Sequence, residues 1–167
     1  MRHAFAIDVS SVAPAGVRQC RGEVFVDVAR RDVFPIVLCC VPGGGMSRRY
    51  FDLDVPAHLG EHSMARALAR QGFVVVTIDH PGVGESDTPD DGYELTPQRV
   101  ADVNAHVVHE VRRRLHAGDL APGLEPITTR ASIGVGHSAG AVVTIHQQAR
   151  HRSHDALALL GFGGRGL

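Results

Sequence analysis

Two patterns of hydrophobic residues run along this chain. Residues 4–9 and 23–29 are apolar at every second position, which is typical of strands with one buried face. The runs 34–41 and 73–78 are apolar throughout, which indicates strands buried on both faces. Proline, glycine and polar residues separate the alternating pair, which therefore predicts a β-hairpin at a sheet edge within residues 1–30.

Helical patterns lie between the apolar runs. Apolar residues recur at every third or fourth position from Val100 to Leu115, and Thr96 and Pro97 before them suit an N-cap and a first helical turn. A shorter helix is predicted at 64–71, with Ser63 as its N-cap.

A third helix is predicted from Ser138 to about Arg150, followed by a buried apolar strand at 156–160. Strands and helices thus alternate from residue 34 onward, which predicts an α/β fold: three layers, α/β/α, around a mostly parallel sheet of about six strands. No repeat or composition break divides the chain, so 1–167 is predicted to be a single domain.

Composition and charge restrict the possible functions. Hydrophobic residues make up 44% and charged residues 21%, as in an ordinary globular protein. The net charge of −1 gives no electrostatic basis for binding nucleic acid or an acidic membrane surface. No apolar run is long enough for a membrane span or a signal-peptide core, so we expect a cytoplasmic protein. All 17 cationic residues are arginine, which excludes lysine Schiff-base chemistry.

The three cysteines fit a reducing compartment better than a disulfide framework. Cys39 and Cys40 are adjacent within an apolar run, so both are expected to be buried as small hydrophobic side chains.

The main candidate for chemistry is Ser138, at the centre of Gly136-His137-Ser138-Ala139-Gly140. An apolar strand precedes this G-x-S-x-G pattern and a helix-compatible run follows it, which is the context of a nucleophile elbow. Small neighbours suit the strained backbone of such a serine. The helix that follows would direct free N–H groups at an oxyanion. The alternative that the pattern leaves open is a helix N-cap after a glycine turn.

Two other loops follow buried strands. Pro42 and the glycines 43–45 come after the run 34–41, where they form either an oxyanion-hole loop or a flexible turn. Asp79, Gly82, Gly84 and Ser86 follow the run 73–78 and form the pattern D-x-x-G-x-G-x-S.

These three loops, in this order, resemble those of the α/β-hydrolase fold family over about residues 34–162. The resemblance implies that Ser138 is the nucleophile of a serine hydrolase acting on a small-molecule ester or amide. It also implies that the N–H groups of Ala139 and of Gly44, or its neighbour Gly45, form the oxyanion hole. No cofactor or metal is expected.

The triad of this family continues with a later acid and histidine, but no carboxylate follows Asp155 and no histidine follows His154. Both residues precede the run 156–160, so we expect them at the opposite end of the sheet from Ser138. His80 is the one histidine expected at the correct end.

We therefore expect only the N-terminal portion of a hydrolase domain, truncated after about the sixth strand and nearly inactive alone. The run 156–160 would be an apolar edge that favours self-association.

Other functions remain open at this stage. A non-catalytic interaction protein on a hydrolase scaffold is the main alternative. Gly134, Gly136 and Ala139 also fit a dinucleotide-binding pattern, but Asp155 lies before its strand instead of after it. His58 and His62 match a zinc-hydrolase pattern that precedes the helix it needs, and His106 and His109 lack further ligands.

Overall fold

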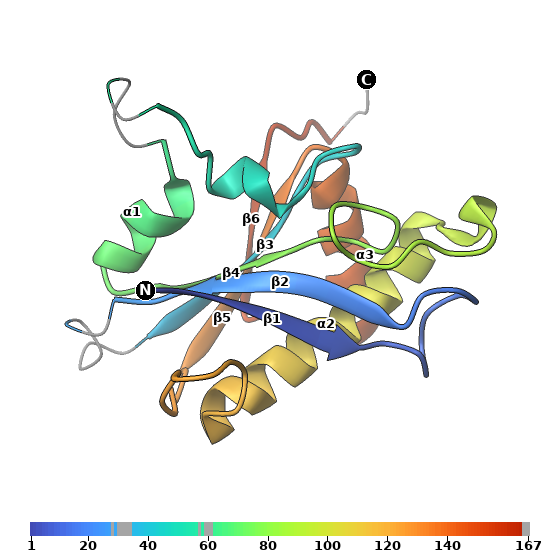
Figure 1. Ribbon diagram of the computed structural model, residues 1–167. Coiled ribbons are helices and arrows are strands. Elements are labelled where there is room, and N and C mark those ends of the chain that lie inside the picture. Colours follow the sequence, from blue (N-terminus) through green and yellow to red (C-terminus); the bar gives the residue numbers. More distant parts are fainter. Residues whose placement is uncertain (28, 30–34, 57, 59–61, 165–167) are drawn as a thin grey trace.

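The computed structural model describes residues 1–27, 29, 35–56, 58 and 62–164. Its sheet has six strands in the order β1-β2-β4-β3-β5-β6, and β3, β4, β5 and β6 are parallel to one another. Helices cover both faces of this sheet (Figure 1), so the predicted three-layer α/β/α architecture is confirmed. The strands are β1 (Arg2–Asp8), β2 (Gln19–Phe25), β3 (Ile36–Val41), β4 (Val74–Ile78), β5 (Ala131–His137) and β6 (Ala156–Leu160).

The predicted hairpin is present, because β1 and β2 pair antiparallel at one edge of the sheet. β2 begins at Gln19, four residues before the predicted start. The alternation of apolar residues is interrupted at Gly22, so the sequence does not reveal this first half of the strand. Gly22 lies opposite Phe5, and a methyl group on Gly22 would lie 2.3 Å from the Phe5 ring, so no apolar side chain fits there. Val28 and Phe34 fall outside the described residues.

The central strands bury both of their faces, as their uninterrupted apolar runs predict. Val37 and Cys39 of β3 pack in one core with α2 (Pro97–Ala117), whereas Leu38 and Cys40 pack in a second core with α1 (Met64–Arg70). This alternation follows from the two-residue period of a strand. All three cysteines are buried and unbridged.

The first two α-helices begin where their N-cap signals predict. Ser63 and Thr96 accept hydrogen bonds from backbone N–H groups in the first turns of α1 and α2, and Pro97 occupies the first turn of α2. The α-helices are α1 (Met64–Arg70), α2 (Pro97–Ala117) and α3 (Ala139–His151); two 3₁₀ helices are η2 (Arg48–Phe51) and η4 (Gly92–Glu94).

The last strand lies at an edge of the described sheet, as expected above, but the buried position that its apolar run also indicated is not observed. β6 pairs with β5 alone and forms the other edge of the described sheet. Leu159 and Leu160 are therefore 38% and 40% exposed. Self-association through this edge stays a prediction. None of the described helices has the length and hydropathy needed to cross a membrane.

Candidate active site

Ser138 lies at a sharp bend between β5 and α3. Its backbone has φ 52° and ψ −120°, a conformation that L-amino acids rarely adopt and that costs about 1–3 kcal/mol. Ser138 does not cap the helix with its side chain, and the residue is exposed. These dihedrals are those expected of a strained elbow and differ from those of an ordinary N-cap.

The flanking glycines allow the strand and helix to meet this closely. A methyl group on Gly136 would lie 2.6 Å from the Ala141 Cα atom, and one on Gly140 would lie 2.3 Å from the Pro42 carbonyl oxygen. Real Cβ contacts are never this short, so both positions require glycine. The two glycines of the G-x-S-x-G pattern are thus required by close packing between β5, α3 and the segment after β3.

The glycine turn after β3 lies beside the elbow. A methyl group on Gly43 would lie 3.3 Å from the Ser138 Cβ atom, and one on Gly44 would lie 3.5 Å from the Ala139 Cβ atom. Gly45 has φ +71° within a turn closed by a hydrogen bond from Met46 N to Gly43 O at 3.1 Å.

Several backbone N–H groups of the glycine turn and of the start of α3 make no hydrogen bond to any described residue. Within the described chain, the N–H groups of Gly44 and Gly45 donate no hydrogen bond. The N–H group of Ala139 begins α3, where no intrahelical acceptor exists. Gly44, Gly45 and Ala139 are all exposed residues.

A buried ion pair connects the end of the glycine turn to the loop after β4. Arg48, in η2 just after the turn, pairs with the fully buried carboxylate of Asp79, and its backbone N–H donates to Asp79 Oδ1 at 2.6 Å. Asp79 Oδ2 also accepts from Glu85 N at 3.0 Å. A methyl group on Gly84 would overlap this carboxylate, which explains the glycine in the D-x-x-G-x-G-x-S pattern.

His80 provides a second anchor and is not placed as a base for Ser138. Its Nε2 atom lies 3.2 Å from the Pro42 carbonyl oxygen, and its Nδ1 atom lies 3.0 Å from Asn104 Nδ2. Burial lowers the pKa of His80, so the neutral ring is favoured. A neutral ring that donates from Nε2 and accepts at Nδ1 satisfies both contacts.

His137 is also engaged elsewhere. Its ring stacks on Tyr50 of η2, with ring centroids 4.5 Å apart and an interplanar angle of 18°. No described residue makes a hydrogen bond to the Ser138 hydroxyl, so the described chain places no general base on it.

His154 and Asp155 lie at the opposite end of β5 from Ser138, as predicted. His154 Nδ1 lies 2.9 Å from the hydroxyl of Ser132, and Asp155 Oδ2 accepts from Ser132 N at 2.8 Å. This serine–histidine pair is buried, and Gln147 contacts the other ring nitrogen of His154 at 3.2 Å. The pair therefore joins β5 to α3 and is closed to substrates.

No potential metal cluster of three or more ligands occurs among the described residues. His106 lies 3.0 Å from the carbonyl oxygen of Asp8. The zinc-hydrolase pattern lies partly outside the described residues, since positions 59–61 belong to it.

Arg48, Tyr50 and Asn104 contribute to this site without having been singled out from the sequence. Their contacts join residues that are 24 to 87 positions apart, and only the folded chain brings these together. One signal existed for Arg48, because a carboxylate directly after a fully buried strand requires a nearby cation.

Comparison with known proteins identifies the family of this chain. The model of the alpha/beta hydrolase family matches residues 36–165. No curated protein matches the sequence.

Several solved structures share the fold. An epoxide hydrolase from Vigna radiata has a TM-score of 0.65 at 14% identity, over 96% of this chain and 38% of that one. The N-acyl homoserine lactonase AidH, complexed with N-butanoyl homoserine, has a TM-score of 0.58 at 14% identity, over 93% and 43%. XC6422 from Xanthomonas campestris, an a/b serine hydrolase without lid, has a TM-score of 0.57 at 20% identity, over 95% and 60%.

The present chain thus spans less than two thirds of the length of each of these proteins. The family model covers most of its residues, from the start of β3 through β6. Together with the strand order and the bend at Ser138, this match means that the chain belongs to the alpha/beta hydrolase family.

Proposed function

We propose that this chain carries the nucleophile and the oxyanion hole of a serine hydrolase that acts on a small-molecule ester or amide. The observation that carries the proposal is the strained, exposed backbone of Ser138 directly beside the glycine turn. Ser138 Oγ attacks the carbonyl carbon of the substrate, and an acyl-enzyme forms as the leaving group departs.

The oxyanion produced by this attack accepts hydrogen bonds from the N–H groups of Ala139 and Gly44, with Gly45 as the alternative to Gly44. Such donors contribute most when they are already fixed before the reaction. The anchors at Arg48 and His80 support this role, because both attach the glycine turn to the loop after β4.

The attack also requires a base to accept the Ser138 proton. His80 and His137 are held by other contacts, and no described histidine is hydrogen-bonded to Ser138. A triad enzyme that lacks its base keeps roughly 10³–10⁴-fold acceleration over water. We therefore expect slow acylation by the present chain, and faster acylation when a base is supplied externally.

A fluorophosphonate probe tests this proposal, with imidazole added as the external base and the labelled peptide located by mass spectrometry. We expect slow labelling on Ser138 that imidazole accelerates and that Ser138→Ala abolishes. Ser132→Ala is the matched control, because Ser132 also lies beside a histidine but is buried; labelling should be unchanged in this variant.

The second candidate is a non-catalytic interaction protein on a hydrolase scaffold, which the absence of a base on Ser138 within the described chain favours. Folded protein that shows no labelling of Ser138, with or without imidazole, would favour this function over the hydrolase.

A further inference from the structure

A groove of about 770 Å³ runs along α2, away from Ser138. Its lining extends from Asp102 to His116 on α2 and includes Thr129 before β5 and Ser153 before β6. These last two residues lie at the amino ends of their strands, whereas Ser138 follows the carboxyl end of β5. The volume is typical of pockets that bind small molecules.

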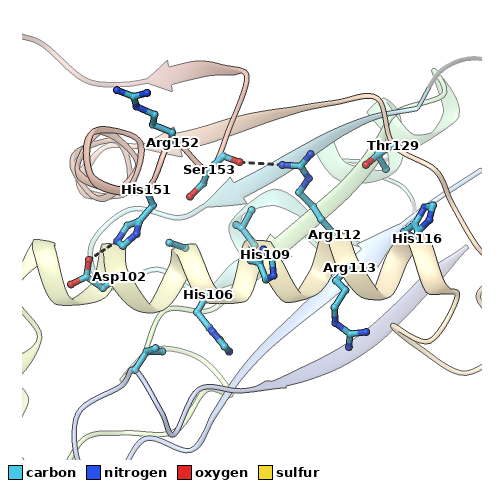
Figure 2. A pocket seen from close by; sticks show the side chains of 13 residues that line it. Asp102, His106, His109, Arg112, Arg113, His116, Thr129, His151, Arg152 and Ser153 are labelled. Carbon is cyan, nitrogen blue, oxygen red and sulfur yellow. Dashed lines mark hydrogen bonds and ion pairs between the residues drawn. The ribbon is translucent and has the colours of Figure 1, made fainter.

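Cationic and imidazole side chains dominate this groove (Figure 2). Three arginines and four histidines line it, against the single carboxylate of Asp102. This excess contrasts with the net charge of −1 for the whole chain. The Asp102 carboxylate is already paired, with Arg150 at 2.8 Å and His151 at 2.6 Å. It therefore does not neutralise the remaining cations.

Two of the arginines retain free donors. Arg112 Nη1 makes one long hydrogen bond, 3.4 Å, to the Ser153 carbonyl oxygen, and Arg152 has no ion pair with any described residue. Figure 2 shows the Arg112 side chain directed at Ser153 and the Arg152 side chain extending away on the other side of Ser153, with His109 one turn before Arg112 on α2. Arg113, by contrast, is paired with Glu110 at 3.1 Å.

The backbone of Arg152 has a defined conformation at the end of α3. It caps α3 in the left-handed conformation, with φ 49° and its N–H donating to the Gln148 carbonyl oxygen at 3.0 Å. The groove also has an apolar part, formed by Val12, Ala105 and Val108. A ligand that combines an anionic group with an apolar body matches both parts.

We propose that this groove binds an organic phosphate, with its phosphate group at Arg112 and His109 and its apolar body over Val12, Ala105 and Val108, while Arg152 adds positive charge on the other side of Ser153. Guanidinium groups bind phosphate oxygens through charge-assisted hydrogen bonds, often two at once. No residue of the groove belongs to the candidate active site, so this binding is independent of the proposed hydrolase function.

Isothermal titration calorimetry with phenyl phosphate tests the proposal, with inorganic phosphate and neutral benzyl alcohol as comparison ligands. We expect phenyl phosphate to bind more tightly than either. Arg112→Gln should weaken its binding about tenfold, and Arg152→Asn, which removes a more distant charge, should weaken it less. Asparagine is chosen at position 152 because it tolerates the left-handed backbone.

Arg99→Gln is the matched control, because it removes the same charge from an exposed position on the same helix, outside the groove. This variant and Ser138→Ala should bind phenyl phosphate as the unaltered chain does. Circular dichroism establishes that each variant is folded.

The proposal is overturned if folded protein does not bind phenyl phosphate at millimolar concentration, or if Arg112→Gln and Arg152→Asn both bind it unchanged. It is also overturned if Arg99→Gln loses as much affinity as they do, since binding would then reflect overall charge. Inorganic phosphate that binds as tightly as phenyl phosphate would contradict the role of the apolar part.

Discussion

The Nε2 atom of His80 lies 3.2 Å from the carbonyl oxygen of Pro42, the residue directly before the glycine turn. Because Asn104 of α2 holds the other ring nitrogen, this contact ties the turn to a helix on one face of the sheet. The same Pro42 carbonyl lies so close to α3 that only glycine fits at position 140. The Pro42 carbonyl group thus connects the glycine turn to α2, through His80 and Asn104, and packs against α3.

Replacing His80 should therefore loosen the glycine turn. His80→Ala leaves the Pro42 carbonyl and the Asn104 amide without their buried partner, and we expect a loss of about 1–3 kcal/mol of unfolding free energy in urea denaturation. His80→Gln, which keeps an amide donor, should lose less. If His80→Ala kept full stability but stopped fluorophosphonate labelling, His80 would be a base instead of a positioning residue.

The backbone strain at Ser138 can also be measured as a change in the free energy of unfolding by urea denaturation. Glycine adopts φ 52°, ψ −120° without a Cβ penalty, so Ser138→Gly should raise the unfolding free energy by about 1 kcal/mol. Ser47 is the matched control, because its φ of −91° is ordinary and its side chain makes no capping bond. Ser47→Gly should be neutral or destabilising. Equal effects of the two substitutions would contradict strain at the elbow.

Breaking the ion pair between Arg48 and Asp79 should be costly. Arg48→Met leaves the buried Asp79 carboxylate uncompensated, and we expect a loss of about 3–5 kcal/mol in urea denaturation. Combining it with Asp79→Asn should cost less than the sum of the two single changes.

The exposed pair of Arg113 with Glu110 provides the comparison for this measurement. Arg113→Met should change stability by at most about 1 kcal/mol, since water screens this pair. A similar small loss for Arg48→Met would mean that the ion pair does not anchor the glycine turn.

His154 should make stability depend on pH. Burial first, and then the charge of Arg112, lowers the pKa of His154 from 6.5 to about 4. Between these values the unfolded chain binds the proton and the folded chain does not, so stability falls as pH decreases. At about 1.4 kcal/mol per pH unit, the loss approaches about 3 kcal/mol by pH 4.

Urea denaturation at several pH values, compared between the unaltered chain and His154→Gln, isolates this contribution. The difference between the two curves should change between pH 6.5 and 4 and stay constant above pH 7. A difference that is the same at every pH would refute the lowered pKa of His154. His80 contributes with the same sign to both curves, so it cancels in the comparison.

Local pattern was enough for the ends of the helices. Ser63 and Thr96 cap the helices that they were predicted to begin, because capping needs only the residue and the next three N–H groups. The position of Ser138 between a strand and a helix was predictable for the same reason.

The sequence by itself determined the α/β class, the order of the elements and the small residues around Ser138, because periodicity, capping and turn preferences act over a few residues. Only the tertiary structure decided which distant residues are in contact and which strands are buried. It decided how far Leu159 and Leu160 of β6 are exposed, although the strand is as apolar as a core strand, because burial depends on neighbours that composition does not specify. It also joined Arg48 to Asp79 and engaged His80 away from Ser138, since both contacts close loops that no local pattern encodes.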